Sequence, residues 1–226
     1  MRSPAPCAGN AMIYVLIVIA LFAAITFIVA RGTTTSEQGA VNLDKANVYA
    51  NQIIQVSNQV KQGVDEMIYS GSTIDELDFC LPSDACYAAG PTNVHKVFHT
   101  DGGGIAVPRL PTEAAHEVDA NPPPGFYIGR FNNVEWTPTA GHDVILVAHQ
   151  IAKSVCQKID EILTGSSTIP ALDQTPAKYL IDASRHTGGT ADLTAANCAG
   201  CASMPALCVS NPAGTMWTYY NIIEQQ

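Results

Sequence analysis

Cysteine is the residue type whose pattern most clearly predicts chemistry in this sequence. Six of the seven cysteines form an even set far from the N-terminus: Cys80, Cys86, Cys156, Cys198, Cys201 and Cys208. An even set is what a disulfide framework in an oxidising compartment needs. Six cysteines can pair in about 15 ways, and spacing favours only the short loop between Cys80 and Cys86. A zinc site on Cys198-x-x-Cys201 with Cys208 is the rival interpretation, but the second close ligand pair of a zinc ribbon is missing.

Histidine supplies the next candidate ligands, in two pairs. His95 and His99 fall in an alternating segment predicted to be a strand, where their side chains would lie about 13 Å apart. His142 and His149 fall on a predicted helix, two turns or about 10 Å apart. Both separations are too long for two ligands of one ion, so we expect no metal site.

Catalytic motifs are missing from the sequence. It has no nucleophile elbow, zincin, Walker or dinucleotide signature. We therefore predict no enzyme and no cofactor, and an anchored hydrolase or metal enzyme is the least favoured function. Charge excludes another class: beyond Arg31 the chain has nine Lys and Arg against twenty Asp and Glu, so its net charge is 9 − 20 = −11. Nucleic-acid binding needs clustered positive charge, so no nucleic-acid partner is expected.

An apolar run from Ala11 to Ala30 precedes these cysteines. Nineteen of its twenty residues are apolar, and Thr26 is the exception. As a helix the run is about 30 Å long, which matches the hydrocarbon thickness of a bilayer. We predict a transmembrane helix over 10–31, with the cysteine-rich part on the oxidising side. A secretory signal peptide cleaved after Ala30 is the alternative.

Gly9 directly precedes the run, in the sequence Gly-Asn-Ala-Met-Ile-Tyr-Val-Leu-Ile-Val-Ile-Ala. This start resembles the N-terminus of type IV pilin-like proteins, which include the pilins and the pseudopilins of type II secretion. The resemblance implies that a leader, residues 1–9, is removed between Gly9 and Asn10. Tyr14 stands at the fifth mature position, where most members have Glu, and the pattern without Glu occurs among minor, tip-located pseudopilins. The family's helix packs into a filament core, which implies packing roles for Tyr14, Leu16, Ile19, Phe22 and Phe27.

Helical periodicity resumes after a polar hinge at residues 32–39. Apolar residues recur at three-to-four spacing from Leu43 to Ile68 and predict an amphipathic helix. A second helix is predicted from Asp143 to Leu163, with Gly165 just past its end. Cys156 on that helix is expected to bridge to one of the three C-terminal cysteines.

Strand signals lie between and after the two helices. Residues 94–107 alternate around Asp101-Gly-Gly-Gly104 and predict a β-hairpin. Further strands are expected over 126–131, 134–136 and 216–223. Residues 166–214 are predicted to be a loop held by disulfides. The aromatic residues of the strands are interpreted as core: Phe126, Tyr127, Trp136, Trp217, Tyr219 and Tyr220.

These patterns together predict an α+β extracytoplasmic domain over 40–226, in which the long helix packs on a small antiparallel sheet. The favoured function is a pilin-like or pseudopilin-like subunit of an envelope filament or secretion apparatus, which acts by helix packing and display of its head. Its partners would be the lipid bilayer and other pilin-like subunits, as a homo- or hetero-oligomer. It would be a single-pass inner-membrane protein with its head in the periplasm or outside the cell. The alternative is an anchored binding or sensing domain that does not polymerise.

Overall fold

The computed structural model describes residues 15–22, 43–90 and 92–226 of the chain. The chain divides into two units, residues 1–40 and 41–226. In the first unit residues 15–22 form a helix, and every residue of that helix is exposed. Among the described residues no helix combines the length and apolar character needed to cross a bilayer. The processing site Gly9–Asn10, the packing residues Tyr14 and Phe27, the hinge 32–39 and most of the span 10–31 lie outside the described residues.

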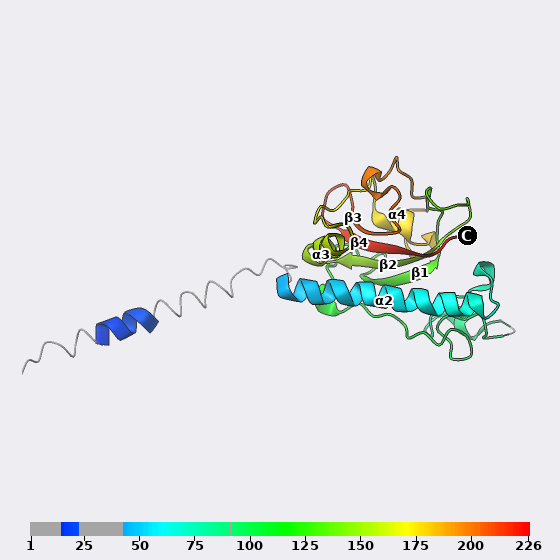
Figure 1. Cartoon of the computed structure of the whole chain (residues 1–226), viewed down its shortest axis with the longest axis horizontal. Coiled ribbons are helices and arrows are strands. Elements are labelled where there is room, and N and C mark those ends of the chain that lie inside the picture. Colours follow the sequence, from blue (N-terminus) through cyan, green and yellow to red (C-terminus); the bar gives the residue numbers. More distant parts are fainter. Residues whose placement is uncertain (1–14, 23–42, 91) are drawn as a thin grey trace, which may run out of the picture. The chain divides into compact units, whose positions relative to one another are not determined.

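Helix α2, Leu43–Tyr69, opens the second unit and confirms the amphipathic helix expected from the sequence. Its apolar positions recur every three or four residues and form one buried face. That face consists of Ala46, Ala50, Ile53, Ser57, Val60, Val64 and Met67. Helix α2 runs beneath the sheet in Figure 1 and is pinned to strand β4 by polar contacts. Asn221 donates to the Ser57 hydroxyl at 2.7 Å, and Lys61 Nζ lies 3.2 Å from the Glu224 carboxylate.

The sheet has four antiparallel strands in the order β1-β2-β4-β3. They are β1 Gly125–Arg130, β2 Val144–Ile151, β3 Ala206–Ser210 and β4 Trp217–Glu224. The strands predicted at 126–131 and 216–223 are therefore confirmed as β1 and β4. The last strand of the chain lies inside the sheet, between β2 and β3.

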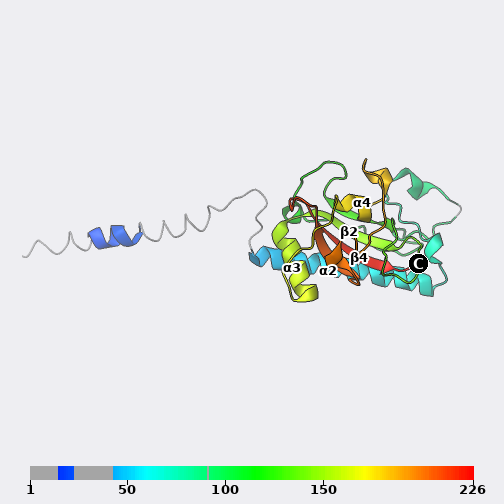
Figure 2. The same cartoon turned by 90° about the horizontal axis from the view of Figure 1, so that it is seen from above.

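Both faces of the sheet are covered, so the domain has two hydrophobic cores. Val144, Leu146 and Ala148 of β2 face a core shared with α2 and α3, Lys153–Thr164. Ile145 and Val147 face the opposite core, which is closed by the C-terminal segments that include α4, Pro176–Leu180. Figure 2, seen from the α4 side, shows these segments lying over the strands.

The predicted helix from Asp143 to Leu163 is wrong in its first half. Residues 144–151 form the central strand β2, and the helix begins only at Lys153. All eight residues of β2 are buried, because the sheet is covered on both faces. A strand buried on both faces is a continuous apolar run, and such a run fits a helical period as well as an extended one. The predicted helix end is correct: Gly165 adopts a φ of 78°, a left-handed conformation that glycine adopts at low cost.

The predicted hairpin over 94–107 is also wrong. Residues 94–104 form successive turns, with one isolated parallel bridge between Asp78 and Lys96. The glycines serve close packing here, because a Cβ at Gly103 would lie 2.6 Å from both the Met67 sulfur and the Val97 carbonyl. Three short 3-10 helices accompany this region: η1 Ile74–Glu76, η2 Ala85–Ala88 and η3 Thr112–Ala114.

The C-terminal region contains more structure than the predicted loop. Besides α4 and β3 it has two 3-10 helices, η4 Ala183–Arg185 and η5 Ala199–Cys201. Conversely, the strand predicted at 134–136 is reduced to one isolated bridge between Val134 and Leu193. The fold is nevertheless α+β, with a long helix on a small antiparallel sheet, as the sequence predicted.

Candidate functional site

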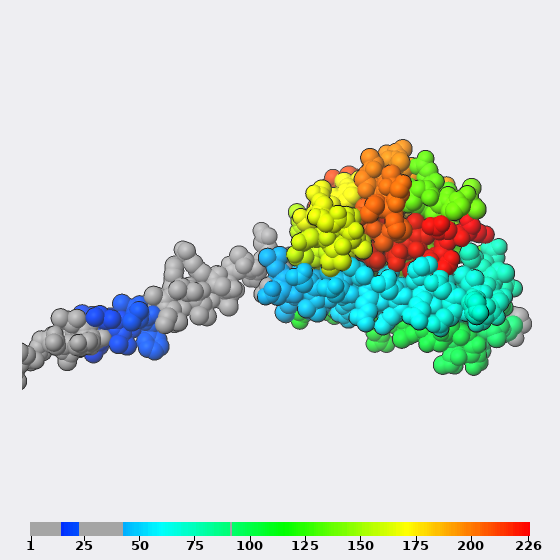
Figure 3. Space-filling view, viewed as in Figure 1, coloured from blue at the N-terminus to red at the C-terminus, as the bar shows by residue number. Residues whose placement is uncertain are grey.

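The outer face of α2 is free of charge over four turns. No Asp, Glu, Lys or Arg occurs from Ala46 to Val60, although the buried face takes up only part of this stretch. The exposed positions carry amides and one valine: Asn47, Val48, Asn51, Gln52, Gln55, Asn58 and Gln59. Figure 3 shows the outer side of α2 uncovered along the head. We refer to these seven residues as the amide face.

The amide face is polar but uncharged, which suits a surface that is buried against another protein. Within the described chain only one of its side chains makes a hydrogen bond, from Asn51 to the Asn47 carbonyl at 2.7 Å. A neutral amide offers two donors and an acceptor, and its burial costs much less than that of a charge when those groups are paired. Charged residues are depleted at the centres of protein interfaces for this reason.

The residues expected to pack in a filament core are described in part. Leu16, Ile19 and Phe22 lie on the helix 15–22, with exposed fractions of 66%, 59% and 66%. Exposed aliphatic and aromatic side chains in such a run are characteristic of a segment that functions in contact with lipid or with other helices.

All six cysteines of the predicted framework form disulfides, paired Cys80–Cys86, Cys156–Cys208 and Cys198–Cys201. The Cys80–Cys86 loop and a bridge from Cys156 to the C-terminal region were both expected. The last two bonds are buried, because Cys156, Cys198, Cys201 and Cys208 are at most 1% exposed. Burial makes these two bonds structural, since thiol exchange requires access to a sulfur.

Asp160 of α3 is the most perturbed carboxyl in the described part of the head. Its side chain is fully buried, and Oδ1 accepts the Cys208 N–H at 2.8 Å. Oδ2 has no partner. Burial raises the pKa of this carboxyl from 3.8 to about 7, although the Cys208 N–H opposes the shift. Asp160 lines neither of the two pockets beside strand β1 that are described below.

His149 is buried in strand β2, not on a helix as predicted. Its Nδ1 lies 2.9 Å from the Thr218 hydroxyl, and its Nε2 has no partner. Burial, with a smaller effect from His186, lowers its pKa from 6.5 to about 4, so the imidazole is neutral at neutral pH. Among the described residues no three His, Cys, Asp or Glu side chains converge as metal ligands.

The predicted strand placement of His95 and His99 is wrong, because both lie in the turns before the glycine run. His95 Nδ1 is 3.0 Å from the Ser72 hydroxyl, which ties this loop to the end of α2. His99 Nδ1 accepts the Asp101 N–H at 3.1 Å. These contacts give both histidines local structural roles.

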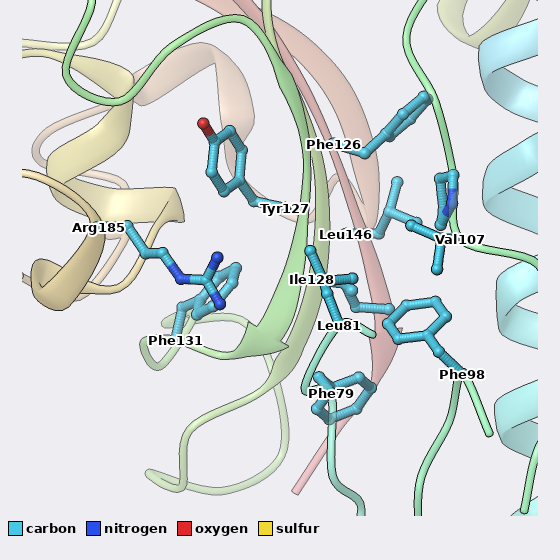
Figure 4. Close-up of a pocket in the computed structure, with 11 residues that line it drawn as sticks. Phe79, Leu81, Phe98, Val107, Phe126, Tyr127, Ile128, Phe131, Leu146 and Arg185 are labelled. Atoms are coloured by element: carbon cyan, nitrogen blue, oxygen red, sulfur yellow. The ribbon is translucent and has the colours of Figure 1, made fainter. Parts of the chain in front are cut away.

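A groove follows the outer edge of strand β1. An apolar pocket of about 40 Å³ touches Phe126 and Ile128 on one side of the strand and Tyr127 on the other. Figure 4 shows Phe131 and Arg185 on the Tyr127 side and Phe79 and Phe98 on the Ile128 side. A neighbouring groove of about 480 Å³ continues along the strand, between residues 75–80 and residues 182–185. No sequence pattern indicated this groove, because its walls come from four distant segments.

Comparisons with known proteins supply no relative. No protein-family model, no curated protein and no solved structure matches this chain.

Proposed function

We propose that this protein is a pilin-like or pseudopilin-like structural subunit of an envelope filament or secretion apparatus. The observation that carries the proposal is the amide face of α2. An exposed helix face without charge can be buried against other subunits at a lower desolvation cost than a charged face.

Two features of the sequence support this proposal. The apolar run 11–30 precedes α2 in the chain, and Gly9 stands at the position where the family's leader is removed. In such a subunit the apolar run would be held in the bilayer and then against sister helices, α2 would extend the contact, and the sheet would be displayed outward. The three disulfides suit a head that works in an oxidising compartment.

N-terminal processing provides the first test. The native protein is isolated from membranes, and its intact mass and N-terminal peptide are determined. The proposal expects a chain that begins at Asn10. A chain that begins at Met1 would contradict it and favour the anchored binding domain, and one that begins at Arg31 would make the protein secreted.

The amide face provides the second test. We expect Gln55→Lys to strongly reduce recovery of the protein in sheared filaments or in cross-linked oligomers, because a buried lysine without a partner opposes packing. Gln225→Lys is the matched control, since it makes the same change at an exposed glutamine outside the amide face. Equal recovery of the two variants would refute a packing role for α2. The melting temperature of each purified variant shows whether the head itself is unaffected.

A further inference from the structure

The two edge strands of the sheet, β3 and β1, differ in the hydrogen bonds made by their outer edges. The outer edge of β3 is covered: Ser210 donates to the Pro170 carbonyl, Leu172 donates to the Ser210 carbonyl, and Cys208 donates to Asp160, at 2.8 to 2.9 Å. The outer edge of β1 has no such cover. Within the described residues, no group outside β2 forms a hydrogen bond with the main chain of Gly125–Arg130.

An uncovered edge strand presents a row of donors and acceptors to any extended chain that reaches it. In an antiparallel pair every second residue directs its N–H and C=O away from the neighbouring strand. Ile128 and Gly129 are buried, so the accessible part of the β1 edge is formed by Gly125–Tyr127 and Arg130. The groove beside β1 gives access to them, since it touches side chains on both faces of the strand (Figure 4). A six-residue extended segment would be about 20 Å long, the length of β1 itself.

The charges around this groove define the occupant. Four carboxylates line its larger part, and Asp75 is the one paired with an arginine, Arg130, at 2.7 Å. The other three have no Lys or Arg within ion-pair distance in the described chain; they are Glu76, Asp78 and Asp182. The second arginine of the groove, Arg185, is directed to Asp84 at 3.5 Å. The groove therefore offers unneutralised negative charge beside an apolar wall.

We propose that the β1 edge binds an extended basic segment of a partner protein, which adds to the sheet as a fifth strand. Main-chain hydrogen bonds to β1 would supply affinity, and alternate side chains would select the partner. Apolar side chains would contact the half-buried Phe79 and Phe126, and Lys or Arg side chains would meet the three carboxylates that have no cationic partner. This site is separate from the amide face, so it does not depend on the proposed filament role.

Synthetic peptides test the proposal on the full-length protein in detergent. The probe is acetyl-Lys-Val-Thr-Val-Lys-Val-amide, titrated by calorimetry, with amide hydrogen exchange measured at β1 and β3. We expect millimolar or tighter binding and slower exchange of alternate β1 amides. N-methylation of alternate peptide nitrogens should weaken binding at least about tenfold, because it removes main-chain donors. Replacement of both lysines by glutamate should weaken it by a similar factor.

Protein variants locate the charge contribution. The double variant Asp78→Asn and Asp182→Asn keeps the acceptor oxygens that bind the Cys80 and Ser184 N–H groups, and it should weaken binding several-fold. Asp192→Asn, outside the groove, is the control and should bind as the unchanged protein does. No binding, binding that tolerates N-methylation, or slowed exchange at β3 in place of β1 would each overturn the proposal.

Discussion

Replacement of Asp160 by asparagine should make the head more stable at alkaline pH. Asparagine is the neutral isostere of the protonated acid, and its oxygen can still accept the Cys208 N–H. The folded pKa of about 7 lies above the unfolded value of 3.8, so the native state binds the proton more tightly. The stability that this proton contributes is fully present below about pH 4 and is lost as the pH rises through about 7.

The size of this stability effect follows from the pKa shift of Asp160. Each pKa unit corresponds to about 1.4 kcal/mol, so the full range is worth about 4 kcal/mol. Between about pH 5 and about pH 8 the unchanged protein should lose about 2 to 3 kcal/mol of unfolding free energy through this group alone. The asparagine variant should not show this loss, because its side chain does not titrate. Comparing the two proteins removes the contributions of other shifted groups such as Asp143 and His149.

Urea unfolding of the oxidised protein at both pH values is the assay, followed by the fluorescence of Trp136 and Trp217. The unfolding free energy of the variant minus that of the unchanged protein should rise by about 2 to 3 kcal/mol from acid to alkaline pH. A difference that stays constant within about 0.5 kcal/mol would mean that Asp160 titrates normally, and would refute the assignment of its pKa to burial.

Three further predictions concern stability and use the same urea assay. Replacing Cys156 and Cys208 together by alanine should lower the unfolding free energy by about 2 to 4 kcal/mol, because their bond closes a loop with a sequence separation of 52; an unchanged midpoint would contradict this. Gly165→Ala should cost about 1 kcal/mol, since its φ is 78°. Asn221→Leu should cost about 1 to 3 kcal/mol by removing the donor to the buried Ser57 hydroxyl, and adding Ser57→Ala should recover part of that loss.

Local patterns predicted α2 and β4, each from a different signal. Helix α2 could be identified because Ala46, Ala50 and Ile53 face the core while the positions between them face water. Strand β4 could be identified from its aromatic and β-branched residues. Strand β2 could not, because cover on both faces removes the alternation that distinguishes a strand from a helix. The run Asp101–Gly104 was misread because its glycines allow close packing against Met67 and Val97, in place of a hairpin turn.

The candidate sites also differ in how far they could be predicted from the sequence. The cysteine framework was predictable as a set, and the Cys80–Cys86 bond from its short loop, but spacing alone left three partners open for Cys156. The charge-free stretch 46–60 is visible in the sequence once α2 is placed. The groove at β1 could not be foreseen, because the identity of an edge strand depends on the order of strands in the sheet, and that order is set by contacts between distant residues.

The position of β4 has a consequence for the timing of folding. This strand follows every other described element in the chain, yet it lies between β2 and β3 and forms one wall of both cores. A nascent chain that lacks residues 217–224 can pair β1 with β2, but β3 then has no strand of the sheet to pair with and neither core can close. The head therefore cannot complete its two cores until residues 217–224 have emerged from the ribosome.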